Sequence, residues 1–283
     1  MLGKLIKHEF FADAKMLVPT YLVVLVLSLL GRFSTWLATR KTIADAVSSS
    51  FASLLQGMAS LLSVLYVIAF IAAMVLTIFY LIYRFYKNFF TDEGYLMMTL
   101  PTKSYSLVTA KFINSVIWVV IGLLVTVLSL YITFSHYDKL MDTISEIYNL
   151  LTRSGDKEYI KDALGTEPGV FITELVVYMV VWFSRFIITW YFAIAFGQLL
   201  SKNHKVVGAI GAYLILRILS SILSTVFLWF ENEVLADVIT GYSTSTGVAL
   251  QTTLIGTSVV SILVCALLFW ATCYIMEHKL NLD

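Results

Sequence analysis

The sequence predicts an all-α membrane protein with six transmembrane helices, and two observations lead to that fold class. Of the 283 residues, 59% are hydrophobic and 13% are charged, which leaves too few charged groups to cover a soluble globule. Apolar runs long enough to cross a bilayer also recur along the chain. Because a backbone in lipid has to satisfy its own hydrogen bonds, each run is expected to form a helix.

Residues 1–15 predict a helix that lies in the membrane interface. On a helical wheel its basic side chains fall opposite its apolar ones, which suits that location. The basic side holds Lys4, Lys7, His8 and Lys15, and the apolar side holds Leu2, Leu5, Ile6 and Phe10. Glu9 and Asp13 interrupt the apolar side. Either they reach the headgroups or nearby lysines, or they face protein.

Six spans are expected within one transmembrane domain that covers residues 1–283. They are residues 17–37, 58–83, 112–135, 175–200, 206–230 and 251–276. The second and sixth lie in charge-free runs, 46–83 and 239–276, that would each form a helix of about 57 Å, nearly twice the hydrocarbon thickness. We expect the hydroxyl-rich beginnings of these two runs to lie outside the core or to re-enter it.

The distribution of Lys and Arg predicts that both termini are cytoplasmic. Ten of these residues fall on the side of the termini and six on the other, and four of the six lie in residues 136–174, far from the spans. The segment 84–111 is then cytoplasmic. Residues 136–174 form an extracellular insert in which apolar residues at helical spacing predict an amphipathic helix.

Several kinds of chemistry are missing from the sequence. No Asp, Glu or His lies within a predicted span, Glu174 being at a boundary, so proton relays and intramembrane proteolysis are disfavoured. We find no nucleotide-binding loop and no metal-ligand spacing. A net charge of +1 argues against nucleic acid as a partner. We therefore expect no catalytic residue, no metal ligand and no cofactor in this chain.

The cytoplasmic segment 84–111 predicts a short exposed helix. Thr91, Asp92 and Glu93 supply capping and negative charge suited to a helix start, and Pro101 prevents its continuation. Exposed Met and aromatic side chains are typical of a helix that inserts into a groove of a partner. The residues between the two ends that would be exposed are Tyr95, Leu96, Met97, Met98 and Leu100.

This segment carries a resemblance to a known family. Asp92-Glu93-Gly94-Tyr95-Leu96-Met97 with Leu100-Pro101 resembles the permease subunits of ABC type 2 exporters, especially the six-span permeases of Gram-positive bacteria. The opening Leu5-Ile6-Lys7-His8-Glu9-Phe10, the stretch Phe196-Gly197-Gln198-Leu199 and residues 202–211 extend the resemblance over nearly the whole chain. The middle motif is the most specific of these.

The resemblance implies partners, a location and a set of coupling residues. The chain would pair with a second permease copy or a homologous permease in the bilayer of a bacterial cytoplasmic membrane. An ABC ATPase subunit, which binds ATP and Mg, would lie below each half. Asp92 to Leu100 would form the coupling helix, with Glu9 in the N-terminal helix beside it. The family's extracellular element often precedes the last span, whereas the insert here follows the third.

Two arginines at depth are candidates for the substrate pathway. Arg185 and Arg217 interrupt the fourth and fifth spans roughly 18 to 22 Å from the cytoplasmic end. A central Arg costs about 2.5–3.5 kcal/mol on insertion scales, so neither is expected to face lipid. They contact either an anionic substrate or a neighbouring helix, or they snorkel outward. Arg32, near the outer end of its span, is expected to snorkel.

The sequence therefore predicts the permease subunit of an ATP-driven exporter, which forms the substrate pathway and catalyses no covalent step. Two alternatives stay open at this point. One is an ATP-independent channel or secondary carrier, and the other is a structural or sensory membrane subunit. The transported substrate and the choice between homodimer and heterodimer do not follow from these residues.

Overall fold

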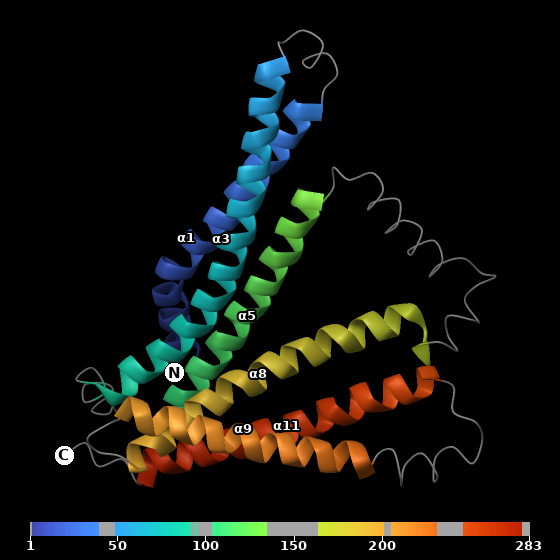
Figure 1. Ribbon diagram of the computed structural model, residues 1–283. Helices are drawn as coiled ribbons and strands as arrows, with labels where there is room; N and C mark the ends of the chain where they lie inside the picture. Colours follow the sequence, from blue (N-terminus) through green and yellow to red (C-terminus); the bar gives the residue numbers. More distant parts are fainter. Residues whose placement is uncertain are drawn as a thin grey trace. The chain divides into compact units, whose positions relative to one another are not determined.

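The computed structural model describes residues 2–39, 49–91, 94, 104–134, 164–200, 205–230 and 246–278. In these ranges the chain forms six long helices and no strand, as the sequence predicts (Figure 1). The helices are α1 (Leu2–Thr39), α3 (Ser49–Phe90), α5 (Ser104–Phe134), α8 (Pro168–Leu200), α9 (Lys205–Phe230) and α11 (Thr246–His278). All six are long and apolar enough to cross a membrane.

The helices are longer than the spans that the sequence predicts. The hydroxyl-rich start of the second apolar run is helical from Ser49. The predicted cytoplasmic segment 84–111 is helical at both ends, because α3 continues to Phe90 and α5 begins at Ser104. The helices therefore include polar and charged residues that lie beyond the ends of the predicted apolar spans.

The helix α8 begins seven residues before the fourth predicted span. Pro168 is its first residue, a position where the missing amide hydrogen of proline removes no helical hydrogen bond. Just before it, Gly165 has a φ of 76°, a left-handed conformation that glycine adopts without steric cost. The amphipathic helix predicted within residues 136–174 lies outside the described residues.

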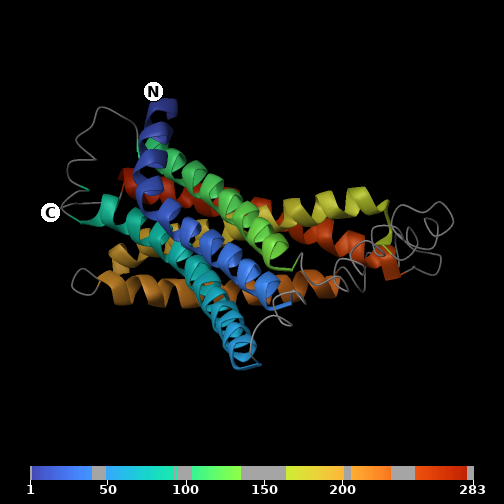
Figure 2. The ribbon, with the colours of Figure 1, turned by 90° about the horizontal axis from the view of Figure 1, so that it is seen from above.

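The helix α1 contains both the predicted interfacial helix and the first predicted span, and it is continuous between them. Pro19 lies inside it and lacks the amide hydrogen that would bond to the Lys15 carbonyl. The hydroxyl of Thr20 donates to the Met16 carbonyl at 2.9 Å, another contact that favours bending. The first turns of α1 accordingly run in a different direction from the rest of the helix (Figure 2).

The outer surfaces of the helices are apolar. At most 33% of the most apolar stretch of any candidate span is buried within the chain, and in α9 the share is 6%. The exposed side chains along α9 include Leu214, Ile218 and Leu219. Such surfaces are unsuited to water and suited to hydrocarbon, so the chain is a membrane-spanning helical protein.

The chain divides into two compact units, and the boundaries fall inside α3 and α5. One unit comprises Gly3–Leu81 and Ile117–Tyr148, and the other comprises Ile82–Val116 and Asn149–Asp283. Since two helices run through both units, the division does not separate independent domains along the sequence.

In the first unit, α1 packs along α3 and α5 through a stripe of its buried residues. Val24 packs with Tyr66 and Ala73 of α3. The Tyr21 hydroxyl donates to the Trp118 carbonyl of α5 at 3.4 Å, and the Phe10 ring stacks on the Trp118 indole with centroids 4.9 Å apart. These contacts hold α1 against its neighbours from Phe10 to Val24.

In the second unit, α8 packs against both α9 and α11. Trp190 of α8 stacks on Tyr213 of α9 with centroids 4.0 Å apart. At Gly197 the two helix backbones approach so closely that an added Cβ would lie 2.4 Å from the Ala209 nitrogen. Small residues permit this close approach, which is how helices commonly associate in membranes.

Candidate functional site

The structure describes four of the eleven site residues that the sequence predicts. Glu9 and Gly94 belong to the predicted coupling set, and Arg185 and Arg217 are the predicted pathway residues. The other coupling residues lie outside the described residues: Asp92, Glu93, Tyr95, Leu96, Met97, Met98 and Leu100. The candidate site consists of the end of α3 that leads into this segment and the helices packed against that end.

Gly94 folds back against the end of α3. Its amide donates to the Thr91 carbonyl at 2.7 Å, which closes a tight turn directly after the helix. A Cβ at this position would lie 2.4 Å from the Phe89 carbonyl oxygen and 2.6 Å from its carbon. Both are backbone atoms, so no side-chain rotation would relieve the clash. Gly94 is therefore the residue that allows the predicted coupling segment to start in this place.

The end of α3 is anchored by stacked aromatic rings. The rings of Phe85 and Tyr191 of α8 lie 3.8 Å apart with planes 8° from parallel, and each side chain is 1% exposed. The Tyr191 hydroxyl is 2.8 Å from the hydroxyl of Ser115 of α5, a hydrogen bond in which either can donate. Three helices thus meet at one buried contact, five residues before α3 ends.

A buried lysine contacts the same end of α3. Lys111 of α5 is 5% exposed, and its Nζ lies 5.6 Å from the centroid of the Phe89 ring, a cation–π contact. With the Asn88 amide oriented to match its neighbours, the Asn88 oxygen accepts from Lys111 Nζ at 2.6 Å and the nitrogen donates to the Arg84 carbonyl at 3.2 Å. We call Phe85, Asn88, Phe89, Lys111 and Tyr191 the α3 anchor.

Sequence reasoning missed the α3 anchor. Lys111 is adjacent to a long apolar run, where a lysine ordinarily extends its charge towards the headgroups. The structure instead buries its ammonium between two helices and supplies it with an amide oxygen and an aromatic face. Since a fully buried lysine is rare unless paired, this is the strongest sign of a specialised contact at this position.

Glu9 and Asp13 lie on the buried stripe of α1. Their exposed fractions are 6% and 2%, so these carboxylates face protein, which was the second of the two alternatives left open by the sequence. They continue the stripe formed by Leu17 and Tyr21. Glu9 is therefore packed inside the chain, and its predicted part in coupling stays a prediction.

The two deep arginines differ in their surroundings. Arg185 is half-buried, and its guanidinium donates to the Ser261 hydroxyl of α11 at 3.1 Å. Further along the same helix pair, the Gln251 amide donates to Glu174 at 3.5 Å, so Glu174 lies within α8 and bonds to α11. Arg217 is exposed on α9, and no described residue accepts a hydrogen bond from its guanidinium. Contact of either arginine with substrate stays a prediction.

We expect Arg185→Met to destabilise the second unit and Arg217→Met not to. Loss of the Arg185–Ser261 hydrogen bond should cost about 1–2 kcal/mol and lower the thermal unfolding midpoint in nanodiscs. Removal of an exposed charge from α9 should leave the midpoint unchanged or raise it. Equal midpoints for the two variants would contradict this assignment.

Arg32 lies at the other end of α1, on an exposed surface. Its guanidinium donates to the Ile132 carbonyl of α5 at 3.4 Å. A hollow of about 20 Å³ beside it has Ser28, Ser63 and Tyr66 in its lining, a volume that holds about one water molecule. This hollow is too small to accept a transported solute.

No group of three or more His, Cys, Asp or Glu side chains in the described ranges is arranged to hold a metal ion. No family model, no curated protein and no solved structure matches this chain.

Proposed function

We propose that this chain is the permease subunit of an ATP-binding-cassette exporter, forming the substrate pathway and coupled to a separate ATPase. The observation that carries the proposal is the closure of Gly94 onto Phe89, which joins the predicted coupling segment to the α3 anchor. A segment that transmits force has to begin from a rigid point. The stacked and buried side chains of the anchor supply one.

Movement of residues 92–100 would reach the helices through the anchor. Phe85 contacts α8 by ring stacking, and Asn88 contacts α5 by its hydrogen bond to Lys111. A push on the segment would therefore tilt α3, α5 and α8 together, because closely packed side chains shift as a unit rather than compress. ATP and Mg would be bound and consumed by the ATPase, and this chain would convert the motion into alternating access.

The N-terminal helix would support this movement from within the chain. Because Glu9 and Asp13 are buried, Glu9 would act by positioning the first turns of α1 and not by direct contact with the ATPase. The Phe10–Trp118 stack attaches the same turns to α5, a helix that also carries Lys111 of the anchor. A second permease copy, identical or homologous, would complete the pathway.

Changing Tyr95, Leu96 and Met98 together to Asp is expected to abolish binding of the partner ATPase. Three apolar side chains that would be buried against the ATPase are replaced by charges that need water. Hot-spot losses of about 2 kcal/mol or more correspond to at least about 30-fold weaker binding. The measurements are co-purification with the cognate ATPase and ATPase stimulation by reconstituted permease.

The matched control changes Ser201, Asn203 and His204 together to Asp; these residues come between α8 and α9 in the sequence and are predicted on the same side of the membrane. It should retain the complex. Vanadate-sensitive, nucleotide-dependent transport in vesicles then separates an exporter from a channel, a secondary carrier or a passive subunit. An intact complex in the Tyr95, Leu96 and Met98 variant would remove the basis of the proposal, as would transport without nucleotide.

A further inference from the structure

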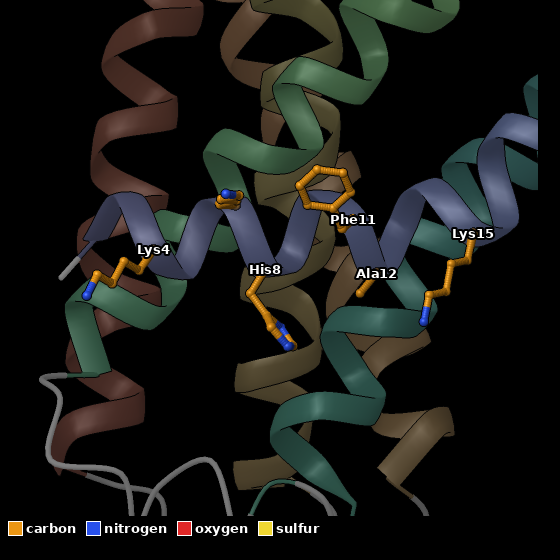
Figure 3. Close-up of a pocket in the computed structure, with 6 residues that line it drawn as sticks. Lys4, His8, Phe11, Ala12 and Lys15 are labelled. Atoms are coloured by element: carbon orange, nitrogen blue, oxygen red, sulfur yellow. The ribbon is translucent and has the colours of Figure 1, made fainter.

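The side of α1 opposite its buried carboxylates is basic. Lys4, Lys7, His8 and Lys15 are all exposed on the first four turns. In Figure 3 the side chains of Lys4, His8 and Lys15 project from the same side of the helix. Phe11 belongs to the same turns of the helix and is 59% exposed. We call Lys4, Lys7, His8, Phe11 and Lys15 the basic face.

The basic face borders a hollow of about 360 Å³, lined entirely by residues of α1. Because one helix supplies the whole lining, the hollow is open to its surroundings and does not enclose a ligand. Its lining combines four basic side chains with the apolar side chains of Phe11 and Ala12. Such a surface fits a ligand with a negative headgroup attached to an apolar body.

The position of the basic face in the chain limits what that ligand can be. It lies on the first four turns of a helix that continues without a break into an apolar span. The first turns of α1 run in a different direction from the rest of the helix (Figure 2), and Pro19 lies inside the helix. An amphipathic segment next to a span is expected to lie at the membrane surface, where Lys attracts anionic lipid and an aromatic ring enters the acyl boundary.

We propose that the basic face of α1 binds the phosphate headgroup of anionic phospholipid. The lysines and His8 contact the phosphates, and Phe11 inserts beside the glycerol and upper acyl chains. Glu9 and Asp13 are kept out of this contact because they lie on the buried opposite side of the helix. The proposal concerns the isolated chain and does not rest on the ATPase partnership.

The test uses the full-length protein in phosphatidylcholine vesicles that contain a trace of spin-labelled phosphatidylglycerol or spin-labelled phosphatidylcholine. The fraction of motionally restricted label measures the lipid preference of the protein. A lysine near an anionic surface contributes about fivefold in binding, the equivalent of about 1 kcal/mol. We expect the wild type to prefer phosphatidylglycerol and the Lys4→Gln, Lys7→Gln, Lys15→Gln variant to lose about fivefold or more of that preference.

The matched control is Lys202→Gln, Lys205→Gln, Lys279→Gln, which removes the same charge on the same predicted side and should retain the preference. High salt should weaken the preference in the wild type. The proposal is overturned if the wild type shows no preference, or if the two triple variants behave alike. It is also overturned if inorganic phosphate at constant ionic strength removes the preference for phosphatidylglycerol, because that result would indicate a site for free phosphate. Binding of the basic face to the ATPase instead of lipid would overturn it as well.

Discussion

Gly197→Ala is expected to separate α8 from α9 and to lower the stability of the second unit. The new Cβ would lie 2.4 Å from the Ala209 nitrogen and 2.6 Å from its Cα, both in the backbone of α9. Helix propensity offers about 1 kcal/mol in favour of alanine, but a clash with rigid backbone costs about 1–3 kcal/mol or more. The clash should dominate, since relieving it also disturbs the Trp190–Tyr213 stack.

The measurement is the thermal unfolding midpoint in lipid nanodiscs, together with the near-ultraviolet signal of the aromatic side chains. Gly211→Ala is the matched control, because a Cβ at Gly211 of α9 would meet nothing within 4 Å. It should be neutral or slightly stabilising. A Gly197→Ala protein as stable as the Gly211→Ala protein would show that the backbones are not in contact.

Gly94→Ala is expected to displace the predicted coupling segment while the helices stay folded. The methyl group would lie 2.4 Å from the Phe89 carbonyl oxygen, and Phe89 is fully buried, so its backbone cannot move aside without disturbing the α3 anchor. An overpacking cost of about 1–3 kcal/mol corresponds to a roughly 5- to 150-fold lower population of the closed turn. If the segment couples to an ATPase, stimulated ATP hydrolysis should fall by a similar factor.

Hydrogen exchange of the residue 94 amide tests, without any partner, whether the turn opens in the variant. The Gly94 amide donates to the Thr91 carbonyl, so its exchange rate reports on the turn. Exchange should accelerate in the alanine variant. Gly57→Ala on α3 is the control, since its Cβ would contact nothing within 4 Å. If exchange is faster but ATPase stimulation is unchanged, the turn exists but does not take part in coupling. Unchanged exchange would reject the turn itself.

The sequence was most informative about the helices and least informative about their ends. Six apolar runs were sufficient to predict six spans, because hydrocarbon imposes both a length and a helical backbone. The requirement for an apolar run also set the end of each predicted span at the first charged residue. Arg84 and Lys87 therefore marked the end of a predicted span, although α3 continues to Phe90.

The sequence by itself determined that this chain spans a membrane. Hydrocarbon favours long apolar helices whatever their tertiary contacts, so composition and the length of the apolar runs are sufficient to predict the spans. Only the tertiary structure decided what each polar residue near a helix end does. Lys111, Glu9 and Lys4 look alike in a hydropathy profile, yet the first is buried under Phe89, the second is buried on α1 and the third is exposed. Their difference arises from which side of a helix meets another helix, and that depends on residues distant in the chain, such as Asn88 for Lys111.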